Sequence, residues 1–188
     1  MWGKKHPIPN ADELWEGEIW VKDHLIDKYG WPLSKEVVEG RMHLAITSSL
    51  LDKDLEAILV PDDNQDYNGR ILINSLYEDD GEFEYMHEVI HYVLDVGVGK
   101  KVNTEFSRHR TGNSNDAHER IVDYYAAVAL APGEKLVEDI KRYRKKWFVT
   151  DEASFMRELQ KKYSCSEECI RQRFKEVHRL IRKKKMKI

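Results

Sequence analysis

The first part of the chain has the apolar spacing of two helices. In residues 11–29 apolar side chains recur every three or four positions, as they do along one face of a helix. Asn10 or Asp12 is the expected N-cap, and Gly30 ends the pattern. Similar spacing over residues 34–46 predicts a second helix, although the pattern does not fix where it ends.

Two short runs of β-favouring residues follow, at 57–60 and 70–74. The turn-forming segment 61–69 separates them, so we predict two adjacent antiparallel strands. An apolar, helix-compatible segment then runs over residues 83–96, and Gly97 ends it. The sequence therefore predicts a strand pair that leads directly into a helix.

Residues 97–115 show no clear periodicity and predict a long loop, of the kind that contacts substrates. We expect this loop to be mobile without substrate. A further helix is predicted from Asn115 or Asp116 to Leu130, because Pro132 and the glycine after it stop the pattern.

The C-terminal part predicts two more helices joined by a short turn. Residues 164–167 form an S-x-x-E capping box that would start the second of them. Arg171, Arg173 and Lys175 on this second helix also fit a helix-turn-helix reader of DNA, but helical hairpins that pack on a core are far more common. The expected buried faces consist of Phe155, Met156, Leu159 and Tyr163 in the first helix and Ile170, Phe174, Val177 and Ile181 in the second.

Length and composition indicate a folded protein of about one domain. The 188 residues are 41% hydrophobic and 35% charged, a balance that argues against global disorder. We divide the chain into a main domain, residues 1–135, and a helical region, residues 136–188, that packs on it. A net charge of only −3 points neither to nucleic acid nor to a membrane surface, and the basic runs 141–146 and 182–187 are interpreted as solvated helix ends.

The expected compartment follows from two features that the sequence does not contain, a secretory segment and a membrane span. The N-terminus has no apolar run of the secretory type, and no stretch approaches the length of a membrane span. Cys165 and Cys169 are interpreted as reduced thiols and as half-buried packing residues. We therefore expect a cytoplasmic protein that does not contact membranes.

The chemistry concentrates in the run His87-Glu88-Val89-Ile90-His91. On a helix His87 and His91 point to the same side and can bind one metal ion. In zinc peptidases with this H-E-x-x-H spacing the metal polarises the scissile carbonyl and acidifies its water, while the glutamate moves the water's proton to the leaving amine. Glu88 is therefore the candidate catalytic residue, and Zn²⁺ is the candidate cofactor.

A catalytic zinc site needs a third protein ligand, and the next predicted helix offers one in Glu119. Asp123 lies four residues further on, where its carboxylate could accept a hydrogen bond from a histidine ring, and Asp95 is a second candidate for that role. His118 is the most serious alternative ligand because it adjoins Glu119. The other alternative ligands are Glu105, His109 and Asp116. Candidates for a donor that stabilises an oxyanion remain unranked and are Tyr92, His109, His118, Tyr124 and Tyr125.

These motifs resemble the ImmA/IrrE family of metallopeptidases, in which a strand pair leads into an H-E-x-G-H helix and a later helix reads E-x-x-A-N-x-F-A-x-x-L-L-M-P. Residues 119–132 match the glutamate, the aromatic, the alanine and the closing proline of the second pattern. Ile90, Val122 and Asp123 depart from it, in place of glycine, alanine and asparagine. The resemblance covers residues 55–135 and fades on both sides.

The resemblance implies a zincin-like α+β fold, mostly helical, with a small antiparallel or mixed sheet before the H-E-x-x-H helix. It implies a zinc endopeptidase that cleaves a cognate helix-turn-helix repressor of a mobile element or stress circuit. The strand nearest the site would hold an extended substrate by β-pairing. The alternative is a non-catalytic regulatory protein that binds a repressor, or DNA through its C-terminal helices, with a structural metal. A closed, four-ligand metal would favour that alternative.

Overall fold

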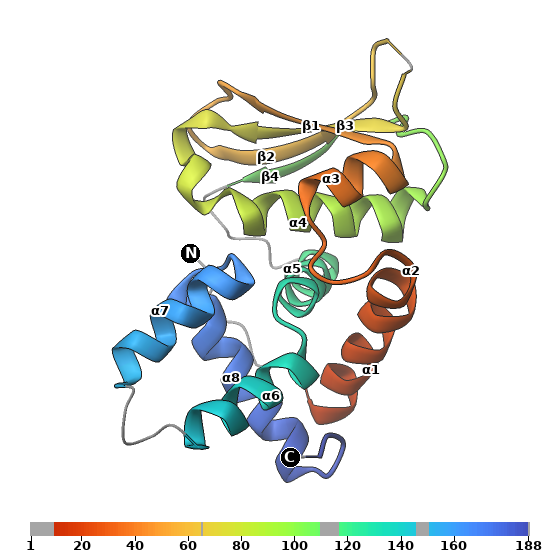
Figure 1. Cartoon of the computed structure of the whole chain (residues 1–188). Helices are drawn as coiled ribbons and strands as arrows, with labels where there is room; N and C mark the ends of the chain where they lie inside the picture. The colour runs from red at the N-terminus through yellow and green to blue at the C-terminus, as the bar shows by residue number, and fades with distance from the viewer. Residues whose placement is uncertain (1–9, 65, 110–116, 146–150, 188) are drawn as a thin grey trace. The chain divides into compact units, whose positions relative to one another are not determined.

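The structure is a computed structural model that describes residues 10–64, 66–109, 117–145 and 151–187. The chain divides into two compact units (Figure 1). The sheet unit is Tyr29–Ala126. The helical unit combines the described residues up to Lys28 with those from Ala127 onward.

Within the described residues the sheet unit has four strands in the order β1-β3-β2-β4 (Figure 1). β2 and β3 are antiparallel neighbours, which confirms the predicted strand pair. β1 pairs with β3 in parallel, and β4 pairs with β2 antiparallel, so the sheet is mixed and the α+β class is confirmed. The strands are β1 Leu44–Ser49, β2 Leu55–Val60, β3 Gly69–Asn74 and β4 Phe106–His109.

The second predicted helix is shorter than its apolar pattern indicated. It consists of α3 Lys35–Val37 and the π-helical η2 Val38–Met42, and it ends at His43, whose φ is 54°. The prediction of helix as far as residue 46 is wrong, because the residues after His43 form β1. Leu44 and Ile46 fit a strand as well as a helix, and the backbone of β3 decides between the two.

β4 lies inside the segment that was predicted to be a loop, so that prediction is wrong for residues 106–109. A strand this short carries almost no periodicity, and its pairing with β2 depends on a partner far away in the sequence. Residues 110–116, which belong to the same predicted loop, lie outside the described part of the chain.

The histidine helix follows the sheet and lies along one of its faces (Figure 1). It comprises α4 Gly81–His91 and the π-helical η4 Tyr92–Val96, after the 3₁₀ segment η3 Ser75–Asp80. It ends at Gly97, as predicted, where φ is 90° and the N–H donates to the carbonyl of Tyr92 at 2.8 Å. Met86, Val89 and Ile90 are completely buried.

The next helix, α5 Ala117–Leu130, confirms the predicted end at Leu130. Its predicted N-cap, Asn115 or Asp116, lies outside the described residues. The first turns of α5 belong to the sheet unit, and its last turn belongs to the helical unit.

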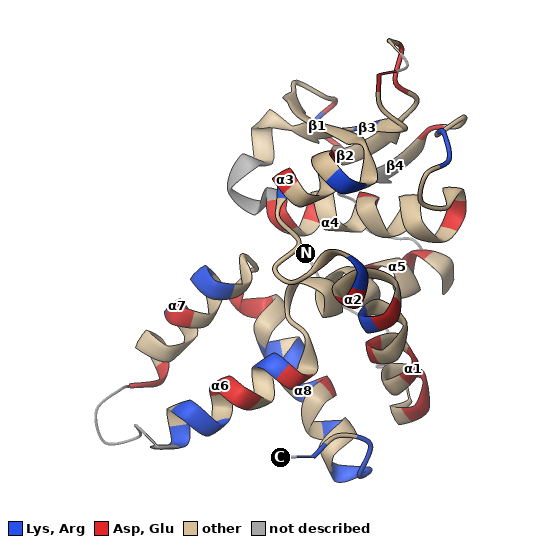
Figure 2. Cartoon of the chain, turned by 45° about the vertical axis from the view of Figure 1, so that its right-hand side comes forward, with Lys and Arg blue, Asp and Glu red and all other residues tan. Residues whose placement is uncertain are grey.

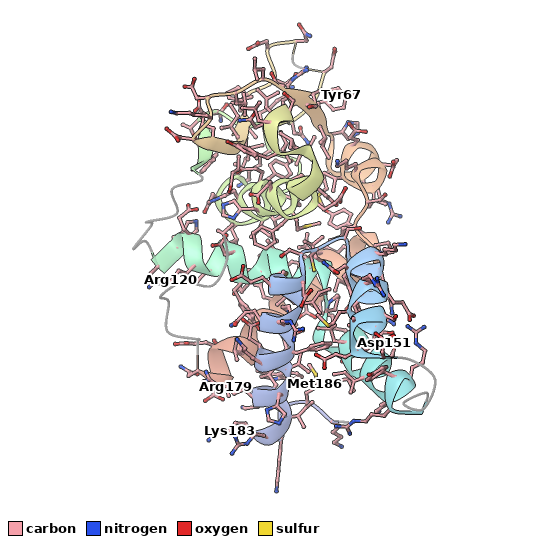
Figure 3. The ribbon with its side chains drawn as sticks, turned by 90° about the vertical axis from the view of Figure 1, so that its left-hand side faces the viewer. Tyr67, Arg120, Asp151, Arg179, Lys183 and Met186 are labelled. Carbon is pink, nitrogen blue, oxygen red and sulfur yellow. The ribbon has the colours of Figure 1, made fainter. Side chains whose placement is uncertain are left out.

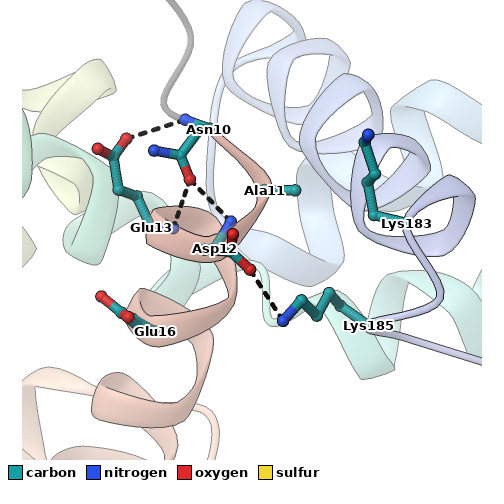
Figure 4. A pocket seen from close by; sticks show the side chains of 7 residues that line it. All are labelled: Asn10, Ala11, Asp12, Glu13, Glu16, Lys183 and Lys185. Carbon is teal, nitrogen blue, oxygen red and sulfur yellow. Dashed lines mark hydrogen bonds and ion pairs between the residues drawn. The ribbon is translucent and has the colours of Figure 1, made fainter.

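The other helices build the helical unit, and their ends follow local signals. Asn10 caps α1 through a capping box: its side chain accepts the N–H groups of Asp12 and Glu13, and the Glu13 carboxylate accepts the N–H of Asn10 at 2.9 Å (Figure 4). Asp12 is not the cap and instead pairs with Lys185 at 2.8 Å. The helices are α1 Ala11–Val21 with its continuation η1 Lys22–Ile26 and α2 Asp27–Tyr29, whose last residue belongs to the sheet unit, and α6 Gly133–Lys145, α7 Glu152–Tyr163 and α8 Glu167–Arg182.

The turn between α7 and α8 differs from the predicted capping box. Ser166, not Ser164, caps α8, and its hydroxyl accepts the N–H of Cys169 at 3.2 Å. Ser164 ends α7 with a left-handed φ of 48°. The N-cap therefore lies two residues later than predicted, and the predicted capping box does not form, because the residue three positions after Ser166 is Cys169, which has no carboxylate to accept the N–H of Ser166. Cys165 and Cys169 are free thiols and buried.

The buried side of α8 differs in part from the prediction. The predicted face of α7 is confirmed, and in α8 Ile170 and Val177 are buried, while Phe174 and Ile181 are only partly covered. Arg173 and Glu176 take their place in the interior. The Arg173 side chain is 0% exposed, so it does not lie on an outer surface that DNA could reach.

Arg173 is the centre of a buried ionic network in the helical unit. Its guanidinium pairs with Glu18 of α1 and, at 2.6 Å, with Glu176, and its Nε donates to the carbonyl of Ala131 at 3.1 Å. Glu18 also accepts the N–H of Gly133 at 3.0 Å. This network joins α1 to the C-terminal helices, and the two units therefore differ from the sequence-based division at residue 135.

The surface charges of the helical unit are unevenly spread. Lys and Arg gather at the C-terminal end of α6 and beyond the end of α8 (Figure 2). Arg179, in the last turn of α8, and Lys183, directly after α8, are labelled in this basic part of the chain (Figure 3). Across the described ranges, none of the helices is both long enough and apolar enough to cross a membrane.

Candidate metal centre

α4 brings His87 and His91 onto one buried side of the helix. They lie four positions apart, so both side chains leave the helix in the same direction. Their exposed fractions are 1% and 5%, and Glu88, between them in the sequence, is 0% exposed. Because charged and polar groups are costly to bury alone, other elements must supply partners for them.

Glu119, in the first turn of α5, brings a carboxylate to both rings. Its oxygens lie 3.3 Å from Nε2 of His87 and 3.3 Å from Nε2 of His91, and the two Nε2 atoms are 3.1 Å apart. Tetrahedral ligands at about 2.0–2.1 Å from a zinc ion are about 3.3 Å from one another. The spacing of the three donors therefore fits an ion of this size.

The other nitrogen of each ring is held by a carboxylate. Nδ1 of His87 lies 2.9 Å from Asp123 of α5, and Nδ1 of His91 lies 2.7 Å from Asp95 of η4. An ionised carboxylate only accepts hydrogen bonds, so each Nδ1 carries the ring proton. Metal-binding histidines have this arrangement, because it fixes the ring and leaves Nε2 free to bind the ion.

The converging donors require positive charge between them. With Nδ1 protonated, a neutral ring presents the lone pair of Nε2, so two lone pairs face the Glu119 carboxylate at 3.3 Å. Electron-rich atoms repel at this range unless a cation or additional protons lie among them. The donor set of two imidazole nitrogens and one carboxylate oxygen is one that zinc prefers, and the residues fit a divalent metal ion.

The pKa values of the donors reflect the same demand for positive charge. Burial lowers the pKa of His91, but hydrogen bonds to Glu119 and Asp95 and the charge of Glu88 outweigh it and raise the pKa to about 9. Hydrogen bonds from His87 and His91 hold the pKa of Glu119 well below its usual value. The group therefore attracts a proton or another cation.

The alternative third ligands do not join this group in the described residues. Nε2 of His118 lies 3.0 Å from the Asp95 carboxylate and belongs to a second group with metal-ligating atoms, His91, Asp95 and His118. Glu105 is exposed and lies in neither group. Asp116 and the side chain of His109 lie outside what the structure describes.

The bulky departures from the family pattern fill the interior. Ile90 and Val122 are both 0% exposed. Each therefore occupies space that glycine and alanine would leave free, and the surrounding packing accommodates the larger side chains.

The side chain that the sequence failed to identify is Phe106 of β4. Its ring stacks on the ring of His91, with centroids 5.6 Å apart and an angle of 27° between the planes. β4 is thereby placed beside the candidate metal ligands, at one edge of the sheet. No motif marks Phe106, since only the pairing of β4 with β2 brings it to the site.

One candidate for stabilising an oxyanion is occupied elsewhere. The Tyr92 hydroxyl accepts the N–H of Gly99 at 2.9 Å and donates to the carbonyl of Lys100 at 3.2 Å. It therefore fixes the turn after η4 rather than pointing a donor at the three metal-ligating atoms.

Comparison with models of known protein families and with curated proteins gives no match to this chain.

Proposed function

We propose that this protein is a zinc-dependent endopeptidase with a zincin-like fold and that it is related to the ImmA/IrrE family. The observation that carries the proposal is the convergence of His87, His91 and Glu119, with a carboxylate behind each ring. A structural zinc is closed by four protein ligands, whereas a catalytic zinc has three and an open position. Within the described residues this group has three, which supports the catalytic role.

The residues around the donors have distinct proposed roles. Zinc held there would supply a Lewis acid that polarises the scissile carbonyl and acidifies water. Glu88 would accept a proton from that water and pass it to the leaving amine. Asp123 and Asp95 would keep the rings of His87 and His91 oriented and their Nδ1 atoms protonated.

The two edges of the sheet differ in how they would receive an extended substrate. At the β1 edge, the N–H of Ile46 donates to the Glu39 carboxylate at 3.1 Å. One backbone donor of this edge is therefore already used and is not open to a substrate strand. At the other edge β4 lies beside the metal centre, through Phe106 and His91. We therefore propose that a peptide substrate adds as a strand to β4.

The class of substrate rests on the sequence resemblance alone. We propose a helix-turn-helix repressor, cleaved in the cytoplasm. The alternative, DNA binding through α8, loses one of its three basic residues because Arg173 is buried, and Arg171 is engaged with Glu167 at 2.7 Å.

The test separates catalysis from metal binding. Glu88→Gln keeps size and polarity but removes the proton acceptor, so zinc content should persist at about one equivalent while hydrolysis falls by about 10²–10⁴-fold. Glu119→Ala removes one of three donors and should weaken zinc binding by at least about a hundredfold. Glu168→Gln, an exposed carboxylate of α8 outside the group, is the matched control and should change neither property.

Zinc content is measured by elemental analysis, and zinc affinity by competition with a chromophoric chelator. Hydrolysis is measured on a proteome-derived peptide library, with new termini read by mass spectrometry. A Glu88→Gln protein that cleaves as fast as the unchanged protein refutes the proposed mechanism. A Glu119→Ala protein that binds zinc normally shows that the third ligand lies elsewhere.

A further inference from the structure

His118 occupies a position that neither the motif nor the proposed ligand set explains. It lies in the first turn of α5, one residue before Glu119, and its Nε2 is 3.0 Å from both oxygens of Asp95. Asp95 in turn holds Nδ1 of His91 at 2.7 Å. A chain of hydrogen bonds thus runs from α5, through a carboxylate of η4, to a histidine of the metal centre.

The two histidines are supported in different ways. The carboxylate behind His87 is Asp123, which comes from α5 itself. The carboxylate behind His91 is Asp95, which comes from the same helical segment as His91. Among these contacts, His118 is therefore the one that ties Asp95 to α5, the helix that carries Glu119.

We propose that His118 is a positioning residue that raises the metal affinity of the site, an inference that rests on the proposed function. It holds Asp95 against His91, and it holds the first turn of α5, and so Glu119, against η4. Histidine serves here because a neutral ring donates from Nε2 to a carboxylate that already accepts from Nδ1 of His91. The effect is preorganisation: the three donors keep the spacing that the ion requires before it arrives.

A second metal ion at His91, Asp95 and His118 is the competing explanation of the same atoms. It would require Nδ1 of His91 to lose its proton while Nε2 faces the first group of donors. Since one proton on Nδ1 satisfies the 2.7 Å contact with Asp95 without a second ion, the hydrogen-bonded arrangement is favoured.

The test measures zinc affinity by chelator competition and the visible spectrum of the cobalt-substituted protein, neither of which needs a substrate. His118→Ala should weaken zinc binding by about three- to tenfold, the effect of one partly exposed hydrogen bond to a charged group. His118→Gln should restore most of the affinity, because its amide nitrogen lies as many bonds from Cβ as Nε2 does. His118→Asn has a shorter reach and should behave like alanine.

A double-mutant cycle tests whether Asp95 transmits the effect. Asp95→Ala should weaken zinc binding by about 10–100-fold, as is usual for a carboxylate behind a ligand histidine. In the Asp95→Ala background, adding His118→Ala should not weaken zinc binding further. The cobalt spectra of the single Asp95→Ala variant and of the double variant should be the same. His178→Ala, an exposed histidine of α8, is the control and should leave affinity unchanged.

Three results would overturn the inference. His118→Ala could bind zinc as tightly as the unchanged protein, its effect could persist in full without Asp95, or the zinc content could fall from two equivalents to one, which would make His118 a ligand. If the wild-type protein binds no zinc, the proposed function is refuted, and this inference is refuted with it. The two failures are therefore distinguishable.

Discussion

Arg173 and Arg171 stand two residues apart on α8 and provide a matched pair for testing what burial does to a charge. Arg173 is 0% exposed, and its guanidinium faces the carboxylates of Glu18 and Glu176, which are themselves 8% and 1% exposed. Arg171 is half exposed and pairs with Glu167 at 2.7 Å, on the surface. Replacing each by alanine removes one positive charge from the same helix.

The expected loss is large for Arg173. Its removal leaves two buried carboxylates without their counter-charge and the carbonyl of Ala131 without a donor. Breaking a buried pair in this way typically costs about 3–5 kcal/mol, against a total stability of about 5–15 kcal/mol for a protein of this kind. Arg171→Ala should have no resolvable effect, because water replaces an exposed partner.

The assay is urea denaturation followed by circular dichroism. With a slope of about 2 kcal/mol per molar urea, the midpoint of the helical unit should fall by about 2 M for Arg173→Ala and stay in place for Arg171→Ala. Burial already raises the pKa of Glu176 in the intact protein. A carboxyl whose pKa is raised in the folded state stabilises the fold at pH values below its unfolded-state pKa, and this contribution is lost as the pH rises through the folded-state pKa. The loss of unfolding free energy in Arg173→Ala should therefore be smaller at pH 5 than at pH 8.

Equal midpoints for the two variants would refute the reasoning, since burial would then have no energetic consequence. A combined variant separates charge from packing. Glu18→Gln, Glu176→Gln and Arg173→Met together leave no unpaired buried charge and should recover most of the loss. If the combined variant is as unstable as Arg173→Ala, lost volume rather than unpaired charge is the cause.

Two further predictions concern the turn before α8 and the loop before β3. Ser166→Ala should lower the unfolding free energy by about 1 kcal/mol, because the cap of α8 is lost, whereas Ser164→Gly should raise it by up to about 1 kcal/mol by relieving the left-handed φ of 48°. Urea midpoints check both expectations. If Ser164→Gly loses more stability than Ser166→Ala, the capping box predicted from the sequence is supported instead. The hydrogen bond from Arg70 and the N–H of Tyr67 hold the pKa of Asp62 below its ordinary value of 3.8. Asp62 therefore stabilises the fold above that pH and loses the contribution as pH falls through the folded-state value, so Asp62→Asn should reduce stability at neutral pH and flatten the acid limb of a stability-against-pH curve. An unchanged acid limb would contradict this assignment.

The elements that the sequence predicts correctly are those whose signals lie within a few residues of one another. The histidine helix and its end at Gly97, the antiparallel pair β2 and β3, and the buried face of α7 all follow from periodicity, turn chemistry and caps within a few residues. The spacing of His87 and His91 also places two imidazoles on one side of a helix without any tertiary contact. The need for a third donor predicts Glu119 as a ligand, and the structure brings its carboxylate to both rings.

Tertiary structure alone decided the rest, because each remaining feature depends on a partner that is distant in the sequence. Leu44 and Ile46 form a strand only because β3 lies beside them, and β4 exists only through β2, which brings Phe106 to His91. Nothing in the sequence near Arg173 distinguishes it from a surface arginine. Its burial is possible because the carboxylate of Glu18, from the other end of the chain, pairs with it. The sequence makes His118 an alternative ligand, and only the position of Asp95 shows that its Nε2 faces a carboxylate. Periodicity reports which side of an element is apolar, whereas the pairing of charges and hydrogen bonds across elements is fixed only when the chain has folded.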